Sequence, residues 1–289
     1  MRISHLVLAT GFLVGTLSAA KADPIIFVDD AANNIARVDV ATRQATVIGN
    51  TGVSGTITDI AFSPTNQLYV IGFTNLYSAD INNGHATLIG SLGQSNVQMN
   101  GLLFGANGTL YASGIAGPVG TVSQETNALF TVNTATGAAT QVGNSAVSTP
   151  TGQHLVSAGD LAFLNGTLYE SVNNGVSGTL SDLVSLDPTT GAATLIGQIV
   201  SDPNMFGLVE ANGTLYGVDG TNLYTINPTT GAGTLVGPIS GIGSANGATN
   251  SFGPVGPPPP SGVPEPASLT LLSAGLAGLA FLRRRKTRS

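Results

Sequence analysis

Short apolar segments alternate with turns rich in Asn, Gly, Pro and Thr between residues 23 and 252. The clearest unit, residues 206–237, reads FGLVEANGTLYGVDGTNLYTINPTTGAGTLVG and divides into the segments GLVE, TLYGV, NLYTIN and GTLVG. Short apolar segments bounded by turn residues indicate β-strands, and Asn-Gly between the first two is typical of a tight hairpin. Because no segment shows a helical period, the body is predicted to be all β.

This four-strand unit recurs five times. Its fourth strand ends at a glycine that recurs at intervals of 41, 53, 54 and 40 residues, namely Gly49, Gly90, Gly143, Gly197 and Gly237. Four antiparallel strands repeating at this spacing are typical of β-propeller blades. The sequence therefore predicts five four-stranded blades. The first repeat lacks its innermost strand, so we expect the segment near residues 245–252 to supply it and close the ring.

Insertions fall only in the connections between strands 2 and 3 of a blade and between consecutive blades, at residues 91–98, 112–127, 144–157 and 171–182. In an antiparallel blade these connections share one side, here called the loop face. The short turns between strands 1 and 2 and between strands 3 and 4 form the opposite side, the hairpin face. Loops held by a rigid scaffold often carry function, so the loop face is the predicted functional surface.

The two ends of the chain read as targeting segments. Residues 1–22 have a basic start, an apolar run and a small-x-small cleavage pattern, which predicts a secretory signal peptide; an uncleaved anchor is the alternative. A Pro/Gly-rich linker, residues 253–262, leads to Val263-Pro264-Glu265-Pro266. An uncharged run, residues 267–282, and the basic cluster Arg283-Arg284-Arg285-Lys286 follow. The run is predicted to be a transmembrane helix with the basic cluster on its cytoplasmic side.

The ordered triplet in residues 263–288 resembles the PEP-CTERM sorting signal of Gram-negative bacteria. The resemblance implies processing by an exosortase at Val263–Pro266, transient anchoring in the inner membrane, and release to the cell surface or outside the cell, in exopolysaccharide-producing, biofilm-forming bacteria. A plain tail anchor is the alternative. The repeats themselves resemble uncharacterised repeats of exported bacterial propellers, which brings no known activity.

Charge narrows the choice of partners. Only Arg37 and Arg43 among the nine Lys and Arg lie in residues 23–262, against fourteen acidic residues there, so this body carries a net charge of −12. Nucleic acid and anionic membrane surfaces are therefore poor partners. The absence of cysteine excludes thiolate chemistry, and the absence of tryptophan weakens the case for a saccharide site.

Two acids stand at equivalent positions in first strands, where other repeats carry Gly101 and Gly207. Because first strands line the axis of a propeller, Asp59 and Asp160 are expected to face the central channel. There they could hold a cation or act as an acid/base pair, or simply be hydrated polar channel residues.

A second set of polar residues is expected on the loop face, and its members are Asp29, Asp30, Asp182, Asp219 and His154. Carboxylate oxygens suit Ca²⁺, although solvated loop acids are the alternative and no calcium-loop motif is present. No other cofactor is expected.

These observations favour an exported, non-catalytic binding or structural module whose partners are exopolysaccharide or surface proteins. One alternative is a hydrolase or lyase of extracellular polymers that uses acids at the channel mouth. Another is a passive spacer that binds nothing.

Overall fold

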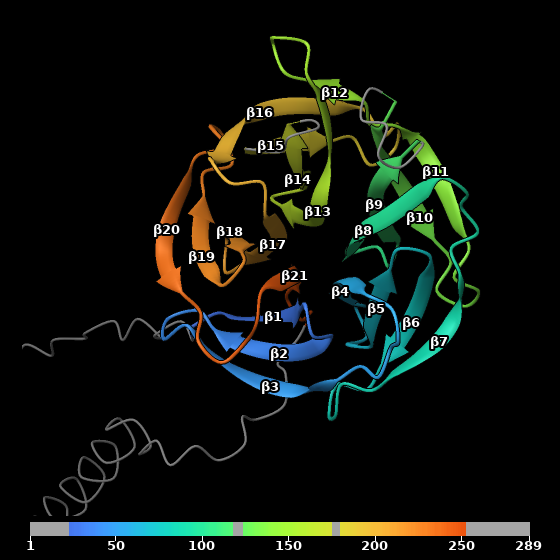
Figure 1. Cartoon of the computed structure of the whole chain (residues 1–289), viewed down its shortest axis with the longest axis vertical. Helices are drawn as coiled ribbons and strands as arrows, with labels where there is room; N and C mark the ends of the chain where they lie inside the picture. Colours follow the sequence, from blue (N-terminus) through green and yellow to red (C-terminus); the bar gives the residue numbers. More distant parts are fainter. Residues whose placement is uncertain (1–22, 118–123, 175–179, 253–289) are drawn as a thin grey trace, which may run out of the picture. The chain divides into compact units, whose positions relative to one another are not determined.

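Five β-sheets surround a central axis in the computed structural model, which describes residues 23–117, 124–174 and 180–252 (Figure 1). Four sheets have four strands each. Blade 1 contains β21 (Ala245–Thr249), β1 (Ile25–Asp30), β2 (Asn34–Asp39) and β3 (Gln44–Asn50), while blade 2 contains β4 (Ile57–Phe62), β5 (Leu68–Gly72), β6 (Asn75–Ala79) and β7 (Ala86–Ser91). Blade 3 contains β8 (Val97–Phe104), β9 (Leu110–Ala116), β10 (Thr126–Val132) and β11 (Ala139–Asn144).

The remaining two blades follow the same plan with one addition. Blade 4 contains β12 (Val147–Ser148), β13 (His154–Leu164), β14 (Thr167–Asn174), β15 (Ser181–Leu186) and β16 (Ala193–Val200); blade 5 contains β17 (Met205–Ala211), β18 (Thr214–Asp219), β19 (Asn222–Ile226) and β20 (Gly233–Pro238). The prediction of five four-stranded blades is confirmed except in blade 4. There the two-residue strand β12 pairs with the start of β13, inside a segment that was expected to be a loop.

Closure of the ring follows the prediction. β21 pairs antiparallel with β1, with Val28 opposite Ala248 and Asp29 opposite Gly247. The last described strand thus becomes the innermost strand of the first blade. The pairing partners of every described strand lie between residues 25 and 249. The propeller, residues 23–252, is therefore a self-contained unit, and the chain divides after Phe252.

Apolar side chains fill the spaces between neighbouring blades. The cluster between blades 3 and 4 is typical, with Leu129, Leu161, Leu168 and Val184 all fully buried. The leucine of each Leu-Tyr pair is buried. Successive side chains along a strand point to opposite faces of the sheet, so each blade contributes side chains to the interfaces with both adjoining blades. Packing between twisted sheets, rather than a single central core, thus holds the blades together.

The repeated glycines lie where consecutive blades touch. A β-bulge in each fourth strand immediately precedes the glycine, as at Val142 before Gly143. A Cβ on Gly143 would overlap the carbonyl oxygen of Thr190 in the next blade, and a Cβ on Gly191 would meet the backbone of Gly143. The same arrangement recurs at three other seams, where Gly49 meets Gly84, Gly90 meets Gly137, and Gly197 meets Gly231. Close backbone approach therefore explains both glycines of the repeat.

The closing seam between blades 5 and 1 differs from the other four. Arg43, with a φ of 56°, stands where the partner glycine stands elsewhere, and its side chain lies against Gly237. Additional hydrogen bonds join the seam, from the N–H of Ser240 to the Arg43 carbonyl at 3.0 Å and from the N–H of Ala45 to the Ser240 carbonyl at 2.8 Å. One of the two cations of the propeller is thus placed at its point of closure.

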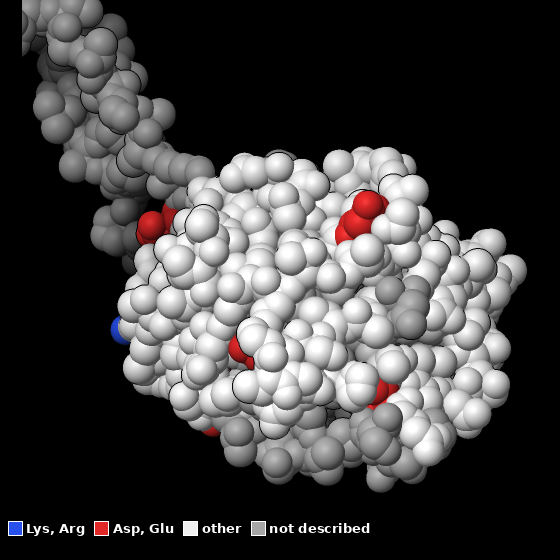
Figure 2. All heavy atoms as spheres, turned by 90° about the horizontal axis from the view of Figure 1, so that it is seen from above, with Lys and Arg blue, Asp and Glu red and all other residues white. Residues whose placement is uncertain are grey.

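Charged side chains are sparse on the edge of the disc shown in Figure 2, where isolated red carboxylates lie on a largely uncharged surface. This matches the charged fraction of 8% for the whole chain. The described surface therefore offers polar and apolar contacts more than ion pairs.

Candidate functional site

The innermost strands of all five blades present one backbone N–H each to a shared pair of carboxylates. Asp59 Oδ1 accepts from Ile60 at 2.7 Å, and Asp59 Oδ2 accepts from Leu102 at 2.5 Å. Asp160 accepts the other three, at distances of 2.6, 2.8 and 2.9 Å, from Leu161, Leu208 and Ala248. Two aspartates therefore satisfy a buried donor from every blade, and we call this arrangement the carboxylate ring.

Glycines make room for the two carboxylates at the equivalent positions of the other three blades. A Cβ on Gly101 would overlap the Gly159 carbonyl oxygen, and a Cβ on Gly247 would overlap Asp59 Oδ1. At Gly207 a Cβ would lie 3.0 Å from the Cβ of Ala248. The alternation of aspartate and glycine that the sequence displays is therefore a packing requirement of the channel.

The carboxylate ring and Asp29 bring three acidic groups together where water is excluded. Asp29, Asp59 and Asp160 all have zero exposed surface. Burial raises the pKa of Asp59 well above its usual range, and the nearby carboxyls of Asp160 and Asp29 raise it further. Burial also raises the pKa of Asp160, against the lowering effect of the N–H groups that it accepts. The pKa of Asp29 rises to about 8, through burial and then the charge of Asp30.

A shared proton is the natural state of such a pair, because two adjacent buried carboxyls rarely ionise together. The pKa of each carboxyl is raised by burial, and the neighbouring Asp160 carboxyl raises that of Asp59 further. Asp59 and Asp160 thus lie together at the propeller axis, with no exposed surface. Among the described residues, no group of three or more His, Cys, Asp or Glu side chains is arranged to hold a metal ion.

The acids expected on the loop face do not form one site. Asp30 accepts hydrogen bonds from the N–H groups of Ala32 and Asn34 at 3.0 Å, and also from Gly243 at 3.2 Å. It therefore stabilises the turn after β1. Asp29 points inside the propeller, contrary to the expectation that it lies on the loop face, because β21 covers it.

The other three members of the set predicted for the loop face differ in their exposure to solvent. Asp182 is 6% exposed and Asp219 is 7% exposed, whereas His154 is exposed at the start of β13. Burial raises the pKa of Asp182, and burial together with Asp202 raises that of Asp219. No hydrogen bond or ion pair connects these three side chains in the described part of the chain.

The sequence analysis missed a buried polar cluster between blades 3 and 4. The Glu170 side chain is fully buried, and Asn127 Nδ2 donates to its Oε2 at 2.5 Å. Ser113 and Ser157 lie beside it, with their hydroxyls 3.2 Å apart. Burial raises the pKa of Glu170 to about 7, while hydrogen bonds from Asn127 and the serines oppose the rise. A signal did exist, because Glu170 follows a Leu-Tyr pair where other repeats have Val70, Ala112 or Gly217.

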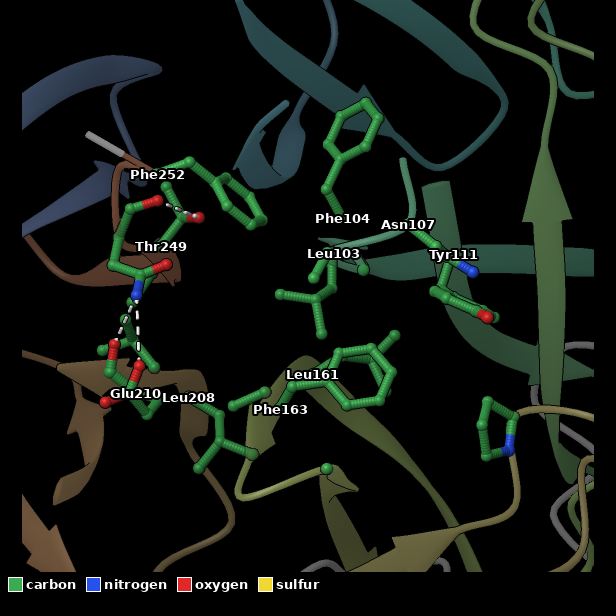
Figure 3. Close-up of a pocket in the computed structure, with 18 residues that line it drawn as sticks. Leu103, Phe104, Asn107, Tyr111, Leu161, Phe163, Leu208, Glu210, Thr249 and Phe252 are labelled. Carbon is green, nitrogen blue, oxygen red and sulfur yellow. Dashed lines mark hydrogen bonds between the residues drawn. The ribbon is translucent and has the colours of Figure 1, made fainter. Parts of the chain in front are cut away.

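A pocket of about 500 Å³ opens at the channel mouth on the hairpin face, opposite to the predicted functional face. The turn after β8, the end of β17 and the residues that follow β21 form its rim (Figure 3). Its aromatic and aliphatic wall includes Phe104, Tyr111, Phe163, Leu103, Val209 and Phe252. We call it the hairpin pocket.

The carboxylate ring adjoins this pocket. Leu161, Leu208 and Ala248 line the pocket, and their N–H groups are the three that bind Asp160. The same strands therefore position both features. Polar atoms in the wall are few. The Glu210 carboxylate accepts from the Gly213 N–H at 2.6 Å. It also accepts from Asn250 Nδ2 at 3.4 Å (Figure 3).

The targeting segments lie outside the described residues. This holds for the predicted signal peptide 1–22, for the motif Val263–Pro266, for the predicted span 267–282 and for the basic cluster Arg283–Lys286. Within residues 23–117, 124–174 and 180–252, no helix is long and apolar enough to cross a membrane.

The propeller is only distantly similar to known proteins. No curated protein matches the sequence. Among solved structures, a protein of unknown function from Bacteroides caccae aligns with a TM-score of 0.44 and 11% identity, covering 78% of this chain and 98% of that one. A gluconolactonase from Xanthomonas campestris aligns with a TM-score of 0.44 and 14% identity, covering 76% of this chain and 79% of that one. Likenesses this distant carry no argument about function.

Residues 262–286 match the PEP-CTERM protein-sorting motif, which confirms the resemblance found in the sequence. The motif implies processing by an exosortase, and export with sorting to the cell surface. This chain is a five-bladed β-propeller that carries a PEP-CTERM sorting motif at its C-terminal end.

Proposed function

We propose that the propeller is a non-catalytic binding module presented at the cell surface or in the extracellular matrix, and that the hairpin pocket is its binding site. The observation that carries the proposal is the pocket itself. A concave, largely apolar volume of about 500 Å³ with few polar groups in its wall is typical of small-molecule sites. The inner strands hold that wall rigid, because the carboxylate ring connects them.

The environment of the acids supports binding rather than catalysis. A general acid or base must come within hydrogen-bond reach of its substrate. Asp59 and Asp160 are fully buried and accept backbone N–H groups. Glu210 is the sole carboxylate among the described residues that line the pocket, and it holds Gly213 and Asn250. A hydrolase or lyase that uses channel-mouth acids therefore has less support than a binding module.

The sorting motif supports a location in the matrix outside the cell. A rigid propeller that retains a small molecule or the apolar end of a larger one would serve there as a receptor or a matrix component. Exopolysaccharide and surface proteins are the partners that we propose for this location.

Calorimetric titration of the propeller, residues 23–252, with 4-phenylbutan-1-ol tests the proposal. We expect one saturable site with a dissociation constant near or below about 1 mM, as the size of the ligand allows. Phe163→Ala should abolish the site, because Phe163 lines the pocket. Phe73→Ala is the matched control, since Phe73 is 40% exposed and lies away from the pocket. No saturable binding, or equal loss in both variants, would contradict the proposal.

A further inference from the structure

The described wall of the hairpin pocket has no positively charged side chain that could bind an anion. Among the described residues that line it there is no Lys, Arg or His, and the one ionisable carboxyl is that of Glu210. The propeller has two Lys or Arg side chains, Arg37 and Arg43, and neither lines the pocket. A negatively charged ligand would therefore lose hydration without gaining an opposite charge.

Aromatic rings line the same pocket on several sides. Phe163 and Phe252 extend toward the interior in Figure 3, whereas the ring of Phe104 points away from it and packs against Tyr69. Tyr111 stands against Phe163 with ring centroids 5.9 Å apart and planes at 68°. Ring faces attract cations through their quadrupole, and the attraction grows when water is excluded. A ligand with an apolar body could fill the volume whether its charged group is positive or negative. Only a positively charged group gains this additional attraction.

Acidic groups also lie behind the pocket. Leu161, Leu208 and Ala248 separate its interior from Asp59 and Asp160 of the carboxylate ring, beside which Asp29 is buried. Among the described residues, no ion pair joins these three carboxyls to a Lys or Arg. Each one that is ionised contributes a negative potential on the pocket side, and low-dielectric surroundings strengthen this potential.

We propose that the hairpin pocket binds an organic ammonium ion with an apolar body. The inference rests on the proposed binding function and specifies its ligand class. The apolar body would occupy the wall formed by Leu103, Phe163 and Val209, while the ammonium group would lie among the aromatic rings near Glu210.

Three ligands that share one apolar body separate the effect of charge from that of size. The probes are 4-phenylbutylammonium, 4-phenylbutan-1-ol and 4-phenylbutyrate, each titrated into residues 23–252 at pH 7.5 and low salt. We expect the ammonium to bind about fivefold or more tightly than the alcohol, as the energies of cation–π and exposed charge interactions suggest. The carboxylate should bind most weakly. Raised ionic strength should reduce the advantage of the ammonium.

The outcomes distinguish the two proposals. Equal affinity of the ammonium and the alcohol would overturn the ligand class while leaving the pocket as a binding site. Absence of binding by all three would overturn both. Glu210→Gln should reduce the ratio of ammonium to alcohol affinity by about half or more, because glutamine retains the acceptor for Gly213 but carries no charge. Asp23→Asn removes the same charge outside the pocket and should leave this ratio unchanged; an equal effect of this control would contradict a local role for Glu210.

Discussion

Asp160 accepts, through one carboxylate oxygen, the N–H groups of both Leu208 and Ala248, at 2.8 and 2.9 Å. A side chain of blade 4 thus binds the innermost strands of blades 5 and 1, and one of these strands closes the ring. Asp59 extends the connection from blade 2 to Leu102 in blade 3. The closure of the ring by β21, the innermost strand of blade 1, is therefore reinforced at the axis by two side chains.

We expect Asp160→Asn to destabilise the propeller by about 3 kcal/mol and Asp59→Asn by about 1 kcal/mol, because unpaired buried donors cost roughly 1–3 kcal/mol each. Asparagine at position 160 has one acceptor oxygen in place of two. Its amide N–H₂ would face backbone N–H donors, which would then have to share that oxygen. At position 59 only two backbone N–H donors are affected, against three at position 160. Urea denaturation of both variants measures the difference. Equal losses, or a larger loss at Asp59, would contradict the larger role of Asp160 in satisfying the backbone donors.

The glycine pairs between blades give a second prediction. Gly143→Ala should cost about 2 kcal/mol or more, because its Cβ would overlap the Thr190 carbonyl and neighbouring blades must separate. Gly55→Ala is the matched control. Neither glycine has a positive φ, and a Cβ on Gly55 would meet nothing within 4 Å. Thermal melts of the two variants should differ by several degrees; similar melting temperatures would show that the seams tolerate a methyl group.

The pH dependence of stability follows from the buried acids. Glu170 has a pKa raised from 4.5 to about 7. A raised carboxyl pKa means that the folded state keeps a proton which the unfolded chain releases. Its contribution is complete below pH 4.5, falls as the pH rises toward 7 and is lost above that. Asp29, with a pKa raised from 3.8 to about 8, acts with the same sign. Unfolding free energies measured at pH 5, 7 and 9 should therefore decrease.

Glu170→Gln tests one part of this dependence in a single variant. A neutral isostere carries no charge into the apolar interface, so the variant should be more stable than the natural chain at pH 9, by up to about 3 kcal/mol. At pH 5, where Glu170 is protonated in the folded state, the two should be nearly equal. Asp187→Gln serves as a control, because the pKa of this exposed turn residue is lowered by the Thr189 and Thr190 N–H groups. A pH-independent difference for Glu170→Gln would contradict a protonated Glu170.

Local residue chemistry predicted the blades well. Asn and Gly in the short turns, together with the repeated Leu-Tyr pair, located the strands of blade 5 to within one or two residues at each end. Even the closing strand was predicted, because the first repeat is one strand short. Asp59 and Asp160 could be paired because they align with Gly101 and Gly207.

The pocket could not be predicted in this way. Its wall combines residues from four blades, including Leu103, Phe163, Val209 and Phe252, and no single repeat shows that these side chains converge. Insertions in the sequence pointed to the loop face, whereas the pocket arises from short hairpins. Asp29 was likewise misplaced, because its burial depends on β21, which is more than two hundred residues away in the sequence.

Removal of the closing strand gives a further prediction. A chain that ends at Ser244 lacks β21 and the Ala248 N–H that Asp160 accepts, and it exposes the edge of β1. We expect it to lose cooperative unfolding or to associate through that edge, whereas a chain that ends at Phe252 should be a folded monomer. Analytical ultracentrifugation and circular dichroism compare the two. A monomeric, fully folded chain ending at Ser244 would show that β21 is dispensable.

The location of the binding site can be measured with a single tryptophan, because the natural chain has none. Phe163→Trp places this reporter in the hairpin pocket, and Phe73→Trp places it on the loop-face connection between β5 and β6. Titration with 4-phenylbutylammonium should change the fluorescence of the first variant saturably and leave that of the second unchanged. A saturable response of the second variant alone would place the site on the loop face and contradict the account.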